Sequence, residues 1–216
     1  MAENVRILTE EITPYLDAAK FAFVVSNLPL RRASRIRSPR NPEDRARRLA
    51  AEVALRRLLR EAGEDYRALT VAYTEAGKPY FEGRHDLTFS LSHSGNLAAV
   101  ALVKAPPGQA APAVGVDIEA LPIGERATRC LALAERFFSP GFRAELRAAA
   151  PEEAPRVFGR LWCLTEAAVK ATGNGAPDFK SAEEILQSAR SRETRFLSDA
   201  FGTEYALACV TLDDKD

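Results

Sequence analysis

Apolar and polar residues recur with a helical period over residues 42–62, and both ends of this stretch carry terminal signals. Asn41 can accept hydrogen bonds from the first turn, and Pro42 suits the first helical position because no donor is needed there. Gly63 can end the helix in a left-handed conformation. The pattern therefore predicts a helix that begins at Pro42 and runs to about Ala62.

Shorter apolar runs bounded by turn residues predict strands, and two later segments predict helices. The expected strands fall at residues 21–25, 69–74, 87–92, 97–103, 113–118 and 204–212. The expected helices cover about 126–138 and 155–172, and Gly173 can end the second. Ser94-Gly95-Asn96 is a turn signal between two expected strands, which indicates a hairpin. Because strands and helices are mixed without strict alternation, we predict an α+β fold with antiparallel sheets.

Residues 104–113 are rich in Pro, Ala and Gly, and they separate the two parts of this pattern. Such a segment is typical of a mobile connection between domains. A chain of 216 residues is long enough for one large domain or two small ones. We therefore predict an N-terminal half over residues 1–108 and a C-terminal half over residues 109–216.

Composition and charge narrow the class of protein. The chain is 46% hydrophobic and 28% charged, as in ordinary globular proteins. Its 30 basic and 30 acidic residues cancel, so no net field directs it to nucleic acid or an acidic membrane. Residues 31–60, however, hold 11 Arg against 3 acidic residues, a local excess of 8 positive charges. This stretch, irregular over residues 31–40, is either a solvated surface or a binding site for an anionic ligand.

The cysteines and the N-terminus indicate the compartment. Cys130, Cys163 and Cys209 match no metal-binding or redox spacing, so we expect buried free thiols in a reducing environment. The N-terminal sequence lacks the basic region and apolar run of a signal peptide. The longest apolar run, Leu97–Val103, is too short to span a bilayer. We predict a soluble, cytoplasmic protein.

Gly115-Val116-Asp117-Ile118-Glu119 holds two carboxylates two residues apart in an expected strand. Side chains alternate along a strand, so Asp117 and Glu119 share one face while the residues between them can face the core. Two acids this close repel each other unless a cation lies between them, and carboxylate oxygens suit Mg²⁺. The alternative is a solvent-facing edge with two unrelated acids.

Trp162, Glu166 and Lys170 are spaced by four residues in the expected helix 155–172, so they lie on one face. A Glu–Lys pair at this spacing is common on helix surfaces, where it contributes only about 0.3–0.5 kcal/mol. The functional interpretation makes Glu166 a metal ligand or general base, and Lys170 a cation for a phosphate.

Two further segments could reach a ligand. Ser92 and His93 lie at the end of an expected strand, where the histidine either donates to a phosphate or fills a turn. Gly77-Lys78-Pro79 is typical of a turn with an exposed lysine. The sequence has no Walker A loop, GxGxxG, HExxH or paired CxxC, so the chemistry depends on these four weak motifs.

In this order, the GKP, SHS, GVDIE and W-x-x-x-E-x-x-x-K motifs resemble the signature of the 4′-phosphopantetheinyl transferase superfamily. The resemblance runs from about residue 31 to 175. The length and the separate N-terminal half resemble the larger, Sfp-like group. This resemblance implies two similar α+β halves, each a mostly antiparallel sheet with a packed helix, and a ligand cleft between them.

The resemblance also implies a reaction, the Mg²⁺-dependent transfer of 4′-phosphopantetheine from coenzyme A to a serine of an acyl or peptidyl carrier protein, releasing 3′,5′-ADP. Asp117, Glu119 and Glu166 match the family's metal-binding acids. Glu166 also matches the residue proposed to deprotonate the acceptor serine, and Lys170 matches the lysine that contacts the pyrophosphate. The expected catalytic residues are therefore Asp117, Glu166 and Lys170.

The other residues carried over by resemblance contact coenzyme A. These are Arg32, Arg35, Lys78, Pro79, Ser92, His93 and Lys170. The histidine would contact a phosphate, the Lys-Pro pair would line the adenine site, and the two arginines fall where basic residues hold the 3′-phosphate. The resemblance further implies a monomer in fatty acid, polyketide or nonribosomal peptide synthesis, with no nucleic acid or membrane as partner.

Thr165 departs from the family, which usually has Lys directly before this glutamate. The change would remove a positive charge beside a phosphate site. One alternative is therefore a weakened relative that binds coenzyme A or a carrier without efficient transfer. The others are a metal-dependent phosphatase or nuclease, and a nucleic-acid-binding domain on residues 31–60. The last is disfavoured because no aromatic residues interleave those arginines.

Overall fold

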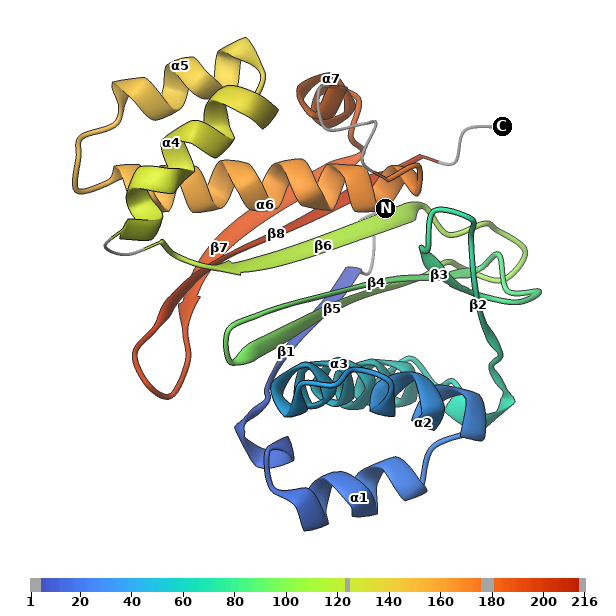
Figure 1. The fold of residues 1–216 in the computed structure, drawn as a ribbon. Coiled ribbons are helices and arrows are strands. Elements are labelled where there is room, and N and C mark those ends of the chain that lie inside the picture. The colour runs from blue at the N-terminus through green and yellow to red at the C-terminus, as the bar shows by residue number, and fades with distance from the viewer. Residues whose placement is uncertain (1–4, 123–124, 176–180, 214–216) are drawn as a thin grey trace.

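The computed structural model describes residues 5–122, 125–175 and 181–213. In this part of the chain, two three-stranded antiparallel sheets lie between two helical layers (Figure 1). One sheet has the strand order β1 (Val5–Glu11), β5 (Leu97–Lys104), β4 (Leu87–Ser94). The other has the order β6 (Ala113–Ala120), β8 (Glu204–Leu212), β7 (Ser191–Ser198). The predicted α+β fold with antiparallel sheets is confirmed.

One long helix packs on the outer face of each sheet (Figure 1). On the N-terminal sheet it is α3 (Pro42–Glu61), accompanied by η1 (Thr13–Tyr15), α1 (Ala18–Ser26), α2 (Leu30–Arg37) and η2 (Tyr66–Ala68). On the C-terminal sheet it is α6 (Ala154–Thr172), accompanied by α4 (Glu125–Phe137), α5 (Pro140–Ala148) and α7 (Ala182–Gln187). A small hairpin of β2 (Val71–Tyr73) and β3 (Pro79–Phe81) lies beside β4. Each half is thus an antiparallel sheet with a packed helix.

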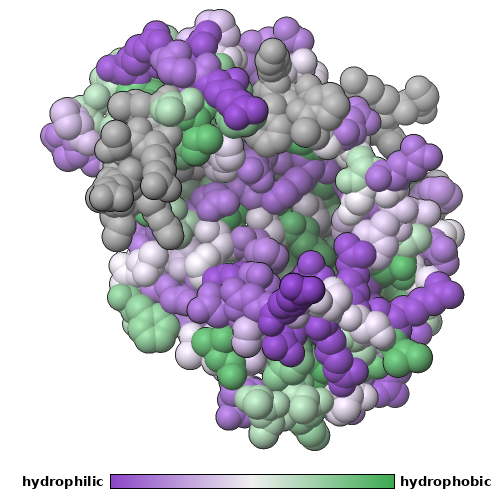
Figure 2. All heavy atoms as spheres, viewed as in Figure 1, coloured by the Kyte–Doolittle hydropathy of each residue, from purple (hydrophilic) through white to green (hydrophobic). Residues whose placement is uncertain are grey.

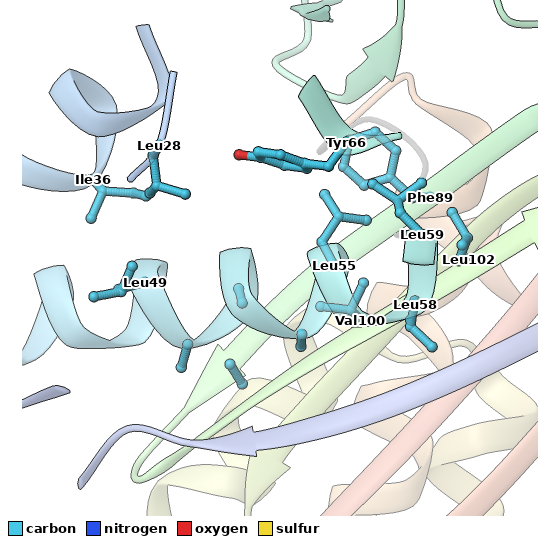
Figure 3. Packing of buried hydrophobic residues seen from close by; sticks show 14 of the residues in the cluster. Leu28, Ile36, Leu49, Leu55, Leu58, Leu59, Tyr66, Phe89, Val100 and Leu102 are labelled. Carbon is cyan, nitrogen blue, oxygen red and sulfur yellow. The ribbon is translucent and has the colours of Figure 1, made fainter. Parts of the chain in front are cut away.

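Strand β5 is buried on both faces, which explains its unbroken apolar sequence. Ala98, Val100 and Leu102 belong to the core under α3, where Figure 3 shows Val100 close to the leucines of that helix. The alternate residues pack against the C-terminal sheet, and they are Leu97, Ala99, Ala101 and Val103. The two sheets therefore form one continuous interior.

The strongest local signals in the sequence are confirmed. Helix α3 begins after Asn41, whose side chain accepts a hydrogen bond from the Glu43 amide at 3.0 Å, and it ends before Gly63 at φ +76°. The hairpin between β4 and β5 turns at Gly95 with φ +51°. The helix ending at Gly173 is confirmed as well.

Two local predictions were wrong. Residues 21–25 lie in α1, not in a strand, because Asp17 caps this helix by accepting from the Lys20 amide at 2.7 Å. Residues 31–37 are helical, not irregular, because Ala33 and Ile36 lie one turn apart on a face that packs into the core. Strands β1 and β7 and helices α5 and α7 were not predicted.

Cys130, Cys163 and Cys209 are buried, as expected, and they form no disulfide bond within the described residues. No helix within the described ranges combines the length and the apolar character that crossing a bilayer requires.

Candidate functional site

Strands β4 and β6, the facing edges of the two sheets, are joined by serine side chains. Ser90, Ser92 and Ser94 alternate along β4, so all three project to the same side. Ser90 Oγ accepts a hydrogen bond from the Val116 amide at 3.0 Å, and Ser94 Oγ accepts from the Ala120 amide at 3.1 Å. These side chains take the place of the backbone hydrogen bonds that would join two paired strands, and they hold β4 and β6 side by side.

The same serines hold the two carboxylates of β6. Ser92 Oγ donates to Asp117 Oδ1 and Ser94 Oγ donates to Glu119 Oε2, both at 2.7 Å. Asp117 is fully buried, with 1% of its surface exposed, whereas Glu119 is half-buried. Asp117 and Glu119 therefore share one face, and the valine and isoleucine beside them enter the core, as the alternation predicted.

Gly115 allows α6 to approach β6 closely. A Cβ at this position would lie 1.9 Å from the Ala167 carbonyl oxygen and 2.6 Å from the Ala171 amide nitrogen. The missing side chain lets the face of α6 that bears Glu166 and Lys170 reach the strand. A local requirement in the strand thus decides where the helix side chains lie.

Lys170 links α6 to both edge strands. Its Nζ donates to Asp117 Oδ1 at 2.5 Å and to Ser92 Oγ at 2.9 Å, and it lies 3.7 Å from Glu166 Oε2. Burial alone would lower the pKa of Lys170, but Asp117 and then Glu166 raise it above the ordinary value. The lysine therefore keeps its charge.

The three carboxylates carry more negative charge than this one ammonium balances. Burial raises the pKa of Glu119 to about 7, and the charges of Asp117 and Glu166 add to the effect. Burial and the Asp117 charge also raise the pKa of Glu166. Asp117 Oδ2 is buried without a hydrogen-bond partner among the described residues. These carboxylate oxygens are suitable ligands for a hard cation, and a bound cation would stabilise the charged forms of Asp117, Glu119 and Glu166.

A ready-made metal cluster is nevertheless absent from the described part of the chain, where no three His, Cys, Asp or Glu side chains are arranged to hold an ion. The expectation that Asp117, Glu119 and Glu166 converge on one metal stays a prediction. In the structure, the Lys170 ammonium lies against Asp117 between these groups.

A pocket of about 400 Å³ opens in front of these groups and reaches across to α2 and α3. In Figure 2, hydrophilic residues gather across the middle of this face, between the two helical layers. Nine of the ten predicted site residues line the pocket: Arg32, Arg35, Pro79, Ser92, His93, Asp117, Glu119, Glu166 and Lys170. Their roles stay predictions, but the fold does bring them to one place.

Lys78 is the tenth predicted residue, and it lies elsewhere. It lines an adjoining cavity of about 210 Å³ and donates from Nζ to the Ala171 carbonyl at 2.6 Å, near the end of α6. The two cavities share Gly77, Pro79, Leu91 and Lys170 in their walls.

The wall opposite the carboxylates is basic. Arg32 and Arg35 come from α2, and Arg48 comes from α3. The guanidinium of Arg35 lies over the Tyr73 ring, 3.8 Å from its centroid. Arg48 Nη1 donates at 2.9 Å to the Arg35 carbonyl, which ties the end of α2 to α3. The pocket therefore has an anionic wall and a cationic wall.

His93 is exposed at the pocket wall. Even so, neighbouring groups partly desolvate its imidazole, which lowers its pKa, and the positive charges of Arg47 and Lys170 lower it further. A neutral imidazole at this position can donate one hydrogen bond to a ligand.

Arg48, Glu52 and Tyr73 line the pocket but were not singled out from the sequence. Arg48 and Glu52 share one polar face of α3 at i,i+4 spacing, and that signal could have identified them. Nothing local marks Tyr73, which reaches the pocket from the β2–β3 hairpin.

Two family models cover most of the chain. Residues 14–104 match "4′-phosphopantetheinyl transferase, N-terminal", and residues 113–214 match "4′-phosphopantetheinyl transferase superfamily". The transferase AcpT of Salmonella typhimurium is 37% identical over 68% of this chain and 69% of its own length. The chain belongs to the 4′-phosphopantetheinyl transferase superfamily.

Two other curated relatives carry the same enzyme name. The transferase HetI of a Nostoc species is 32% identical over 85% of this chain and 77% of its own length. The Bacillus subtilis transferase is 31% identical over 62% of this chain, which spans about half (54%) of that relative. The two-part match agrees with the larger, Sfp-like group of the superfamily. It leaves residues 105–112 unmatched, and our division into residues 1–108 and 109–216 stays a prediction.

Thr165, the departure from the superfamily pattern, does not line the pocket. It is 1% exposed, and its hydroxyl donates to the Leu161 carbonyl at 2.8 Å within α6. The threonine itself therefore lies away from the pocket, and the expectation that it removes a positive charge beside a phosphate site stays a prediction.

Proposed function

We propose that this protein transfers the 4′-phosphopantetheine group of coenzyme A to a serine of an acyl or peptidyl carrier protein, with Mg²⁺ bound. The observation that carries the proposal is the single pocket in which the acids of β6 and α6 face the arginines of α2 and α3. Coenzyme A bears a pyrophosphate and a 3′-phosphate. A pocket with cationic groups at two separate places suits such a ligand.

The hydrogen-bond donors of the pocket divide between the two phosphate positions. Lys170 and His93 lie beside the acids, where they would receive the pyrophosphate. Arg32 and Arg35 lie across the pocket, where they would receive the 3′-phosphate. Arginine guanidinium groups suit this role because they donate several hydrogen bonds to one phosphate.

Asp117, Glu119 and Glu166 are the residues that would hold Mg²⁺. The support is Asp117 Oδ2, which is buried and has no hydrogen-bond partner in the part of the chain that the structure describes. Burial and neighbouring carboxylate charges also raise the pKa values of Glu119 and Glu166. Bound Mg²⁺ would supply positive charge to the pyrophosphate as the P–O bond breaks.

The reaction forms a bond between the serine Oγ and the phosphorus nearest the pantetheine. The bond from that phosphorus to the bridging oxygen breaks, and 3′,5′-ADP leaves. The serine proton passes to a carboxylate, for which Glu166 is our candidate because its raised pKa suits a general base. Lys170 would stabilise the charge that develops on the 5′-phosphate of the leaving 3′,5′-ADP.

Mass spectrometry of the carrier tests the proposal. Apo carrier protein, coenzyme A and MgCl₂ should give a carrier heavier by one phosphopantetheine, and EDTA should prevent the gain. Phosphate release from coenzyme A without a carrier would instead indicate a hydrolase. No gain on acyl, peptidyl and aryl carriers alike would refute transfer and favour a binding protein.

A further inference from the structure

Glu52 is a buried carboxylate in the basic wall of the pocket. It lies on α3 with 6% of its surface exposed, and it lines the pocket beside Arg32. A buried carboxylate is costly unless both of its oxygens are paired. Arg32 Nη2 donates to one oxygen, and the Tyr66 hydroxyl donates to the other. These contacts join three elements, α2, α3 and η2.

Tyr66 donates a hydrogen bond to Glu52, and its aromatic ring supports the Arg32 guanidinium. Burial and the neighbouring Glu52 raise the pKa of Tyr66, so its hydroxyl stays protonated and can donate this hydrogen bond. Its ring lies above α3 with the hydroxyl directed away from Phe89, toward the α2 side (Figure 3). The guanidinium of Arg32 lies over this ring, 5.4 Å from the centroid. Arg32 is therefore fixed by a hydrogen bond and by an aromatic face.

Arg32 uses only part of its donor capacity in these contacts. Its Nε and Nη1 atoms are buried and have no hydrogen-bond partner among the described residues. Leaving buried donors unpaired is costly, so such groups in native sites generally meet a ligand or water. A side chain that is firmly held, with donors to spare at a pocket wall, is arranged for recognition.

We propose that Glu52 is a positioning residue, which with Tyr66 holds the Arg32 guanidinium so that its remaining N–H groups donate to an anionic group of coenzyme A. This inference rests on the proposed function. Because Glu52 cancels the formal charge of Arg32, the pair supplies oriented donors more than net charge. Arg35 and Arg48 supply the net charge of this wall.

The chain contains a matched control outside the pocket. Glu10 accepts from Arg57 Nη1 and from the Tyr15 hydroxyl, each at 2.9 Å. This second Arg–Glu–Tyr group also ties α3 to another element, β1, and none of its members lines the pocket. Loss of either glutamate should therefore weaken the fold, but only loss of Glu52 should weaken coenzyme A binding.

Calorimetric titration of coenzyme A into the full chain, without a carrier, tests the inference. Glu52→Gln should raise the dissociation constant about tenfold, the loss of one well-placed charged hydrogen bond. Glu10→Gln should leave it unchanged, although both variants unfold at lower temperature. In transfer assays, Glu52→Gln should raise KM for coenzyme A and largely keep kcat.

The positioning role predicts that the two residues act as a unit. Adding Glu52→Gln to Arg32→Ala should weaken binding no further than Arg32→Ala alone. Unchanged affinity in Glu52→Gln, or a full additive loss in the double variant, would overturn the inference while the proposed function stands. If the unaltered protein fails to bind coenzyme A, both are refuted.

Discussion

Replacing Gly115 by alanine tests whether the approach of α6 to β6 builds the site. The added methyl would lie 1.9 Å from the Ala167 carbonyl oxygen, and real Cβ contacts are essentially never shorter than 3.0 Å. Both close neighbours are backbone atoms, so α6 must shift by roughly 1 Å instead of turning a side chain aside.

The size of the effect follows from this shift. Overpacking in a close-packed interior typically costs about 1–3 kcal/mol, and a clash with backbone belongs at or above the upper end. For a chain of this length, each kcal/mol lowers the melting temperature by roughly 2–4 °C, so we expect a fall of about 6–12 °C. A displacement of about 1 Å at the Lys170–Asp117 contact should lower the transfer rate about a hundredfold.

Thermal unfolding by circular dichroism and the carrier mass assay measure the two effects. Gly141→Ala is the matched control, because its added methyl meets only the flexible end of the Glu183 side chain, at 2.5 Å. That variant should keep both stability and rate. If Gly115→Ala also melted within 1 °C of the unaltered protein and transferred at full rate, the role we give to this close approach would be refuted.

Three further outcomes are expected. Glu166→Gln should melt at the same temperature as the unaltered protein but transfer at least about a hundredfold more slowly, because general-base catalysis typically contributes about that factor. An undiminished rate would remove Glu166 from the mechanism. Thr165→Lys should lower the melting temperature, because position 165 is 1% exposed and would bury a charge; an unchanged melting curve would show that the lysine reaches solvent. Arg84 and Lys104 lower the pKa of Glu64 to about 2, so the stability that this carboxylate contributes is present above about pH 4.5 and lost as the pH falls toward 2. The stability difference between the unaltered protein and Glu64→Gln should shrink over that range in acid titrations of unfolding, and a difference that grows would contradict the assignment.

The sequence by itself determined the elements whose signals are local. Asn41 and Pro42 mark the start of α3, Gly63 marks its end, and Gly95 marks the hairpin, because caps and turns depend only on a few neighbouring residues. Strand alternation likewise put Asp117 and Glu119 on one face before any packing was known. The order of four short motifs was enough to indicate the superfamily.

Only the tertiary structure decided the elements whose stability depends on distant partners. The segment FAFVV (21–25) has the composition of a strand, but it forms a helix whose Val25 is buried in the N-terminal core, with Phe21 and Val24 packed against that core. Residues 31–37 are helical because a helix buries Ala33 and Ile36 together in the core that packs against α3. Propensity is a weak guide where burial against distant parts of the chain contributes more to stability than local preference does.

The site shows the same division. The sequence supplied the types of residue, but the contact of Lys170 with Asp117 joins positions 53 residues apart, and it exists because Gly115 lets a helix backbone touch a strand. In the sequence, Glu52 is one more charge on a polar helix face. Its role follows from its contacts in the folded chain with Arg32 of α2 and Tyr66 of η2. Side-chain roles of this kind arise from three-dimensional neighbours, which no local pattern of residues encodes.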